Sequence, residues 1–390
     1  MKNKELGIYV HIPFCQQKCF YCDFVSFGGN LQKCNQYIDA ILCEIDSFDF
    51  SKYNVSTIYF GGGTPSYIDQ ENIQKIMQKI LKKLEKQNNK DIEITIEVNP
   101  GTVDKEKLTT YFDMGFNRIS IGLQTANDTL LKKIGRIHDY KQFIETYILA
   151  KEVGFKNINV DLMFALPNQT ITDLKETIQK IIELDIQHIS VYSLILEEGT
   201  ILYDLVEKGK EKIVDEEIER NMYWYIKNIL ELHGFKHYEI SNFAKNGFES
   251  KHNMHCWNQH EYIGFGIASH SFIKNIRYCN SDNMEEYLEK SKEFRKIQKE
   301  ESNKLLEYKE VLENMTEIEL QKEYIMLGFR KIKGFSINEF KAKFGCNPLF
   351  MFRHELSKLV DEELIEIDGD NIHLTNKGLD LANIVFEEFV

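Results

Sequence analysis

The stretch GIYVHIPFCQQKCFYCDF, residues 7–24, decides the fold. Its beginning, 7–13, is a β-branched and aromatic run that predicts a strand, ended by a proline that has no N–H to give to a sheet. The strand leads directly into Cys15, Cys19 and Cys22, a CxxxCxxC pattern. Three thiols within eight residues can hold one soft metal centre. The stretch therefore predicts a metal-binding loop directly after a first strand.

Five further runs of this kind follow before Thr200, at 55–62, 91–99, 118–124, 157–164 and 188–194. Helical patterns such as 70–84 and 141–153 lie between them. Strands that alternate with helices predict a parallel sheet, and six such units predict an α/β fold of the open, partial (β/α)6 barrel type. Prolines follow four of the strands, at Pro13, Pro65, Pro100 and Pro167. In barrels, the loops after the strands build the active site.

The pattern changes after Thr200 and predicts four regions. These are the barrel at 1–200, an extension rich in Gly, His and aromatic residues at 201–283, a charged helical linker at 284–315, and a C-terminal domain at 316–390. In the last region, helical segments precede a predicted hairpin turn at 368–371. Helices followed by a hairpin are typical of a small α+β, winged-helix-like domain.

Charge and hydropathy exclude several classes of function. The chain carries 48 basic and 61 acidic residues, a net charge of −13, which argues against general nucleic-acid binding and against a polybasic membrane anchor. No apolar run approaches the roughly 20 residues of a membrane span, and no signal-peptide core begins the chain. These features predict a cytoplasmic protein whose eight cysteines stay reduced.

The cysteine loop leaves three interpretations open. A structural zinc site with a remote fourth ligand is one, and packing of buried thiols is another. Zinc motifs usually come as two separated pairs of ligands, which favours the third interpretation, an iron–sulfur cluster. A loop with three cysteines leaves one iron of a four-iron cluster without a protein ligand.

Nine short sequence motifs carry a resemblance to a known family. In order they are YVHIPFC, CFYCDF, YFGGGTPS, EVNPG, RISIGLQ, GRIHD, NVDLMFALP, VYSL and YEISNFA. The chain thus resembles the radical S-adenosylmethionine (SAM) superfamily over 7–280, in the branch of oxygen-independent coproporphyrinogen III dehydrogenases and haem chaperones. The resemblance implies that Cys15, Cys19 and Cys22 hold a [4Fe-4S] cluster whose open iron chelates SAM. The reduced cluster of that family can cleave SAM to methionine and a 5′-deoxyadenosyl radical.

A glycine turn and polar strand ends form a candidate SAM site. Glycines let the backbone approach a ligand, although a tight turn explains the 61–63 run equally well. Polar groups inside parallel strands are costly unless paired, so they indicate either a ligand or an internal hydrogen-bond network. By resemblance, the residues that contact SAM are Gly62, Gly63, Thr64, Glu97, Gln124, Arg136 and Asp161. Tyr9 and Tyr21 match positions beside the cluster or SAM, and Tyr9 equally fits a role as barrel filling.

Two features favour the chaperone branch. Phe24 stands where the dehydrogenases carry a further cysteine, and only six residues precede the first strand, where the dehydrogenases have a longer extension. The segment KHNMHCWN at 251–258 resembles the HNxxYW motif of the chaperones, which is implicated in haem binding. His252 matches this motif, while Cys256 replaces its tyrosine. Imidazole and thiolate both ligate haem, so the resemblance implies His252 as a ligand and leaves Cys256 as either a ligand or a filler.

The resemblance thus implies a haem chaperone of the radical SAM type that has no dehydrogenase activity of its own. Its expected partners are haem, respiratory proteins that accept haem, and a second copy of the chain when the cluster is intact. The negative charge leaves membrane association at most indirect, through a protein partner. Three alternatives remain: oxidative decarboxylation of coproporphyrinogen III to protoporphyrinogen IX, another radical reaction on a tetrapyrrole, and regulatory DNA binding by the tail. The tail carries 18 acidic against 11 basic residues in 301–390, which disfavours the last of these.

Overall fold

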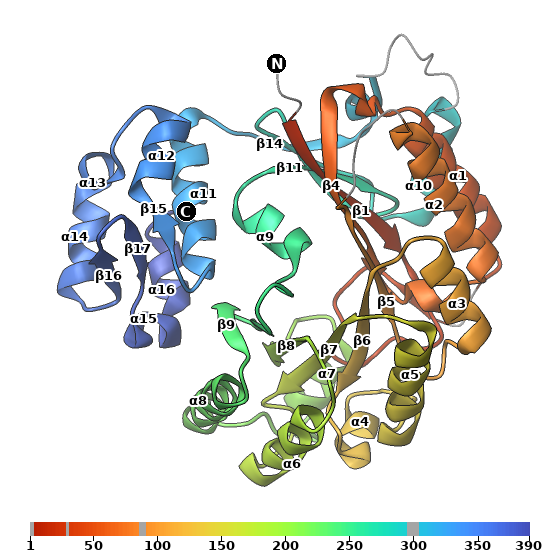
Figure 1. The fold of residues 1–390 in the computed structure, drawn as a ribbon, viewed down its shortest axis with the longest axis horizontal. Coiled ribbons are helices and arrows are strands. Elements are labelled where there is room, and N and C mark those ends of the chain that lie inside the picture. The colour runs from red at the N-terminus through yellow and green to blue at the C-terminus, as the bar shows by residue number, and fades with distance from the viewer. Residues whose placement is uncertain (1–3, 29–30, 86–90, 295–303) are drawn as a thin grey trace.

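A computed structural model describes residues 4–28, 31–85, 91–294 and 304–390. A twelve-stranded sheet, in the order β14-β13-β12-β11-β1-β4-β5-β6-β7-β8-β10-β9, organises most of the chain (Figure 1). Its centre is seven parallel strands: β1 (Lys4–Ile12), β4 (Tyr53–Gly62), β5 (Glu93–Val98), β6 (Arg118–Gln124), β7 (Asn157–Phe164), β8 (His188–Ser193) and β11 (Glu261–Phe265). The first six are the predicted strands in the predicted order, which confirms the open, partial barrel.

Helices connect these strands and cover the outer face of the sheet (Figure 1). They are α1 (Cys34–Asp46), α2 (Gln70–Leu84), α3 (Lys105–Asp113), α4 (Asp128–Lys133), α5 (Tyr140–Val153) and α6 (Ile171–Ile182). Helix α2 has the predicted bounds, and its apolar stripe of Ile73, Ile76, Met77 and Ile80 is buried. Helix α5 begins at a capping box of Asp139 and Gln142 and ends at Gly154, whose φ of 118° lies in the left-handed region.

Antiparallel strands extend both edges of the parallel sheet. Strands β10 (Asn242–Ala244) and β9 (Lys236–Glu239) follow β8, while β12 (His270–Ile273), β13 (Ile276–Cys279) and β14 (Glu310–Asn314) follow β11. Strand β14 lies inside the predicted linker. Its five side chains are all exposed, which agrees with a solvated segment.

The remaining helices of this part include the predicted linker helix. They are α7 (Ile201–Glu207), α8 (Glu216–Leu232), α9 (Lys251–Trp257) and α10 (Met284–Phe294). Three short 3-10 helices are η1 (Phe50–Lys52), η2 (Pro65–Tyr67) and η4 (Lys304–Tyr308). The buried ammonium of Lys309 bonds to the equally buried carboxylate of Glu44 on α1, which also accepts hydrogen bonds from Tyr287 and Asn280. A buried ion pair needs such additional hydrogen bonds, and this one anchors the segment before β14 to α1.

The C-terminal region has its own core. Its elements are α11 (Glu317–Arg330), β15 (Phe335–Ser336), α12 (Ile337–Phe344), α13 (Pro348–Met351), α14 (Arg353–Asp361), β16 (Ile365–Asp368), β17 (Asn371–Leu374), α15 (Asn376–Asp380) and α16 (Ala382–Glu387). Phe329, Phe335, Phe340 and Phe352 pack together in this core. Strands β16 and β17 pair across the predicted turn, in a small sheet of order β15-β17-β16. The predicted small α+β region is confirmed.

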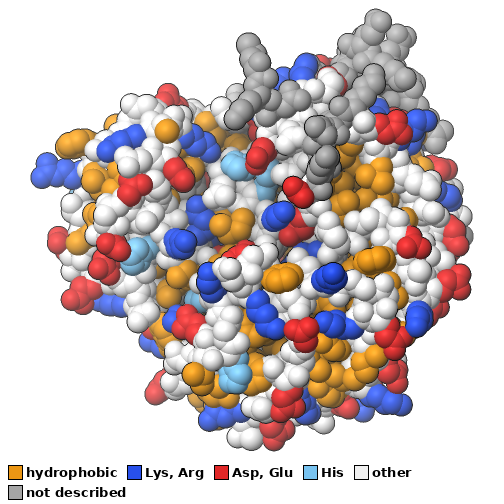
Figure 2. Space-filling model, viewed as in Figure 1, with side chains coloured by type: hydrophobic (Ala, Val, Ile, Leu, Met, Phe, Trp, Pro, Cys, Tyr) orange, Lys and Arg blue, Asp and Glu red, His pale blue; other side chains and the backbone are white. Residues whose placement is uncertain are grey.

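Helix α9 lies between the parallel sheet and the C-terminal region, where it contacts β1, β4 and α11 (Figure 1). Figure 2 shows basic and acidic side chains interspersed over the face in view. In the described part of the chain, no helix is both long enough and apolar enough to cross a membrane.

Candidate functional site

The three cysteines of the CxxxCxxC loop lie together at the carboxyl end of β1. Cys15 belongs to the short strand β2 (Phe14–Cys15), which pairs with β3 (Phe27–Gly28), and is buried, whereas Cys19 and Cys22 are partly exposed. All three are free thiols. A hydrogen bond of 3.2 Å from the Cys22 N–H to the Cys19 carbonyl turns the loop back on itself. Burial raises the pKa values of Cys15 and Cys22, a shift that a bound cation reverses.

The glycine turn after β4 approaches this loop closely. Gly62 has a φ of 114°, in the left-handed region. A Cβ atom on Gly63 would lie 3.0 Å from the Cys15 sulfur and 2.9 Å from the backbone of Pro13. The Thr64 hydroxyl lies 3.6 Å from the same sulfur. Only a residue without a side chain fits at position 63, so the GGGT segment forms one wall of the cysteine loop.

Arg136 links the cysteine loop to the strand ends. Its Nη2 donates to the Tyr21 hydroxyl over 2.9 Å, and its Nη1 donates to Asn99 Oδ1 over the same distance. The amide of Asn99 in turn donates to Thr64 Oγ1 over 2.8 Å. Arg136 Nε is buried and has no hydrogen-bond partner among the described residues. The guanidinium thus holds Tyr21 in place and keeps one buried donor unused.

Two carboxyl groups lie in the carboxyl-terminal halves of β5 and β7. Glu97 accepts a 2.7 Å hydrogen bond from the Tyr59 hydroxyl, and burial raises its pKa to about 7. Asp161 accepts hydrogen bonds from Ser120 and Asn159 at 2.9 and 2.8 Å, and burial raises its pKa as well. Raised pKa values in a pocket of polar groups are typical of a functional site.

A pocket of about 420 Å³ joins these groups. Its lining includes all three cysteines and every predicted SAM contact except Tyr9 and is completed by Tyr59, Asn99, Ser120, Met163, Tyr192 and the exposed Phe24. Gln124 lines it with a φ of 73°, a conformation that costs energy for a residue with a side chain and is common at functional sites. Tyr9 lies deeper in the barrel, where its hydroxyl is 3.0 Å from His11 Nδ1. That position agrees with barrel filling.

Several lining residues were not assigned from the sequence. Asn99 stands two residues after Glu97 in the EVNPG word, and this proximity was the available signal. Tyr59 lies in the middle of an apolar strand and carried no signal, because its role depends on the neighbouring strand that places Glu97 beside it.

Helix α9 carries the predicted haem motif at the opposite, amino ends of the strands. The His252 imidazole is enclosed on the barrel side, with Nδ1 2.9 Å from Thr57 Oγ1 and its ring stacked on Tyr59 at 5.0 Å. Burial lowers its pKa to about 3. Burial raises the pKa of the Cys256 thiol to about 12, so this thiol stays protonated at neutral pH. Haem ligation by His252 and Cys256 stays a prediction.

A cavity of about 800 Å³ lies between α9, β9 and the segment after α11. Phe235, Tyr238 and Ile332 give it apolar surface. Its charged lining is balanced, with three lysines and three glutamates: Lys236, Lys331, Lys333, Glu231, Glu249 and Glu339. Met254 of α9 lines it, as does His237, whose ring stacks on Phe243 with a centroid separation of 4.4 Å. Burial lowers the pKa of His237 to about 4, and its Nδ1 is buried without a hydrogen-bond partner in the part of the chain that is described.

The side chains around the cysteine loop fit a four-iron cluster together with SAM. Three free thiols converge on one pocket and match the three cysteine-held irons of such a cluster. The unpaired Arg136 Nε and the space that a Cβ at position 63 would fill both belong to this pocket. Buried carboxyl groups beside it suit the amino and hydroxyl groups of SAM.

This fold and site define a radical SAM protein. Residues 9–181 match the Radical SAM superfamily, and residues 315–381 match the HemN C-terminal domain. Membership of this superfamily implies a [4Fe-4S] cluster and SAM.

Within that class, the chain belongs to the HemW family. It is 37% identical to the heme chaperone HemW of Lactococcus lactis, over 100% of this chain and 98% of that one. It is 37% identical to the HemW of Bacillus subtilis, over 98% of both chains. Coproporphyrinogen III oxidase (HemN) from Escherichia coli, a radical SAM enzyme, has a similar structure, with a TM-score of 0.83 over 99% of this chain and 90% of that chain. At 22% identity, this last likeness concerns the fold alone.

Proposed function

We propose that this chain is a cytoplasmic haem chaperone that binds haem and passes it, unchanged, to respiratory proteins that require it. The observation that carries the proposal is the likeness to the Lactococcus protein named heme chaperone HemW over the whole chain. The likeness therefore includes α9 and the C-terminal region as well as the SAM barrel.

At the carboxyl ends of the strands, Cys15, Cys19 and Cys22 would hold the cluster, which would supply an electron for reductive cleavage of SAM. Gly62, Gly63, Thr64, Gln124 and Arg136 form the walls against which SAM lies. Glu97 and Asp161 accept hydrogen bonds from its polar groups. Tyr21, held by Arg136 over 2.9 Å, lines the same pocket.

Haem occupies the cavity of about 800 Å³ beside α9, a volume within the usual range for cofactor sites. Its apolar side chains suit the macrocycle. Three of its six charged side chains are lysines (Lys236, Lys331 and Lys333), which suit the two propionates. Met254 and His237 present a thioether and an imidazole, both of which ligate haem iron in other proteins. In this arrangement, His252 anchors α9 to the barrel from the other side of the helix.

An anaerobic haem titration of the cluster-loaded protein, followed by the Soret band, tests the proposal. We expect saturable binding, with haem recovered unchanged by mass spectrometry and no turnover of coproporphyrinogen III. Absence of haem binding, or turnover of coproporphyrinogen III, would contradict the chaperone function.

Three variants locate the haem. Met254→Leu keeps the volume of the side chain but removes the sulfur, so we expect at least tenfold weaker binding. His354→Ala, which changes an exposed histidine on α14, is the matched control and should bind as the wild type does. Unchanged affinity in Met254→Leu beside a loss of the Soret shift in a folded His252→Ala would place the haem at His252 instead.

The cluster-loaded chain is further expected to form a homodimer and to contact membranes only through a recipient protein. Sedimentation of the cluster-loaded and cluster-free proteins, side by side, tests the first expectation.

A further inference from the structure

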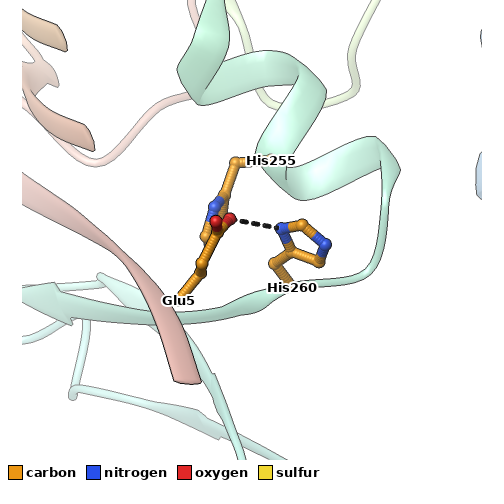
Figure 3. Close-up of side chains that lie close together, drawn as sticks. All are labelled: Glu5, His255 and His260. Carbon is orange, nitrogen blue, oxygen red and sulfur yellow. Dashed lines mark ion pairs between the residues drawn. The ribbon is translucent and has the colours of Figure 1, made fainter. Parts of the chain in front are cut away.

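Two histidines and a glutamate meet at the amino end of β1, on the far side of the barrel from the cysteine loop. They are Glu5 of β1, His255 of α9 and His260 of the turn after α9 (Figure 3). One ligating atom from each lies within 4.8 Å of the other two. Glu5 and His260 also line a cavity of about 760 Å³. About 23 Å of strand separates Glu5 from the end of β1 at Ile12, at roughly 3.3 Å per residue, so this cluster is distinct from the cysteine site.

The hydrogen bonds of His255 show which ring nitrogen carries the lone pair. Its Nε2 lies 2.8 Å from the carbonyl oxygen of Glu261, and a carbonyl only accepts, so Nε2 carries the proton. Its Nδ1 is therefore the basic nitrogen, 3.2 Å from the hydroxyl of Ser56. A metal-binding histidine usually donates its other ring N–H to a carbonyl or carboxylate in this way.

The side chains of His260 and Glu5 lie close together but do not form a full hydrogen bond. His260 Nδ1 lies 3.4 Å from Glu5 Oε2, and it is buried without a hydrogen-bond partner among the residues described. The rings of His255 and His260 are edge to face, with centroids 4.9 Å apart. The nearby carboxylate of Glu261 bonds to Lys4 through Oε1, while its Oε2 is buried and unpaired within the described chain. Two orphaned buried atoms, one a nitrogen and one a carboxylate oxygen, thus border the same cavity.

We propose that Glu5, His255 and His260 bind a divalent transition-metal ion of the zinc type, with one position open to the cavity. Two imidazoles and one carboxylate are a donor set that zinc accepts, and three protein ligands with an open fourth position are typical of accessible zinc sites. The Lys4 ammonium, which also lines the cavity, is paired with Glu261, so its positive charge is compensated. The ligands come from β1, α9 and the turn after α9, so the ion clamps α9 to the first strand.

Metal analysis of the cluster-loaded protein tests the site, because the cysteines are then occupied by iron. After equilibration with micromolar Zn²⁺ and removal of free ion, we expect one zinc per chain in the wild type and in His354→Ala. His260→Ala and Glu5→Gln should each weaken zinc binding at least tenfold. Both residues are substantially exposed, and circular dichroism and iron content confirm that the variants fold and keep their cluster.

Cobalt gives a second readout that does not depend on affinity. Co²⁺ bound by imidazole and carboxylate shows only weak visible d–d bands, whereas thiolate ligation adds strong near-ultraviolet charge-transfer absorption. We expect the weak bands alone, and their loss in His260→Ala. Wild-type protein without zinc, variants that retain it, or a thiolate spectrum would each overturn the proposal.

Discussion

At the carboxyl ends of the parallel strands, Glu97 and Asp161 face a pocket of about 420 Å³, whereas at the amino ends Thr57 and Glu93 bond to α9. The two oxygens of Glu93 accept the backbone N–H groups of Lys251 and His252 at 3.1 and 3.0 Å, which places a carboxylate at the beginning of the helix. The polar groups at the carboxyl ends face the pocket, whereas Thr57 and Glu93 at the amino ends bond to α9.

This difference predicts that substitutions at the two ends of the same strands affect different properties, ligand binding at one end and stability at the other. Changes at the carboxyl ends should remove ligands while the fold survives, because these side chains line an open pocket. Changes under α9 should lower the free energy of unfolding while the ligands remain, because each lost hydrogen bond leaves a buried partner unsatisfied.

The largest expected effect is the loss of the cluster in Cys19→Ala. Removal of one of three ligand thiols should abolish the visible charge-transfer absorbance and nearly all of the bound iron and sulfide. Cys346→Ala, at a partly exposed cysteine of the C-terminal region, is the control and should keep both. Full iron and sulfide content in Cys19→Ala would show that the ligand assignment is incorrect.

Arg136→Gln should weaken SAM binding by about 10- to 100-fold, the usual loss for charge-assisted hydrogen bonds. The guanidinium holds Tyr21 and Asn99 at the same time, which a lysine cannot do with one ammonium, so Arg136→Lys should restore little. Equilibrium dialysis with SAM measures the effect, and unchanged iron content serves as the internal control. Wild-type affinity in Arg136→Gln would remove this residue from the site.

The pKa of Glu97 predicts a dependence of stability on pH. Burial raises this pKa from 4.5 to about 7, so between these values the folded protein holds a proton that the unfolded chain has released. The free energy of unfolding therefore falls as pH rises through this window, by about 2 kcal/mol for a carboxyl group that also faces the pocket. Urea unfolding of the cluster-free protein at pH 5 and pH 8 measures the fall, and Glu97→Gln should abolish this contribution. An equal fall in both proteins would assign it to other groups.

Local sequence patterns predicted the site at the carboxyl ends of the strands but gave no signal for the contacts at the amino ends. Strand runs, the prolines after them and CxxxCxxC are local signals, and they placed Cys15 and Glu97 at the same end of the sheet, where both line one pocket. At the amino ends of the strands, α9 packs against the barrel, and it lies almost 200 residues after Thr57 in the chain. No local pattern indicates that His252 faces the Thr57 hydroxyl. The motif around His252 suggests a haem ligand, and this stays a prediction. The motif gave no signal that the imidazole stacks on Tyr59, because tertiary contacts decide where a short helix docks.

Thr57→Val tests the amino ends of the strands, and its expected effect on the free energy of unfolding is the smallest of these predictions. Valine keeps the shape but removes the hydroxyl, which leaves His252 Nδ1 buried without its partner, so the free energy of unfolding should fall by about 1 kcal/mol. Thr109→Val on the exposed face of α3 should change it by less than about 0.5 kcal/mol. SAM affinity and iron content should stay at wild-type values in both variants, since Thr57 does not line the pocket. A tenfold loss of SAM affinity at unchanged stability would show instead that the amino ends of the strands take part in cofactor binding, most directly through Tyr59, which stacks on His252 and bonds to Glu97.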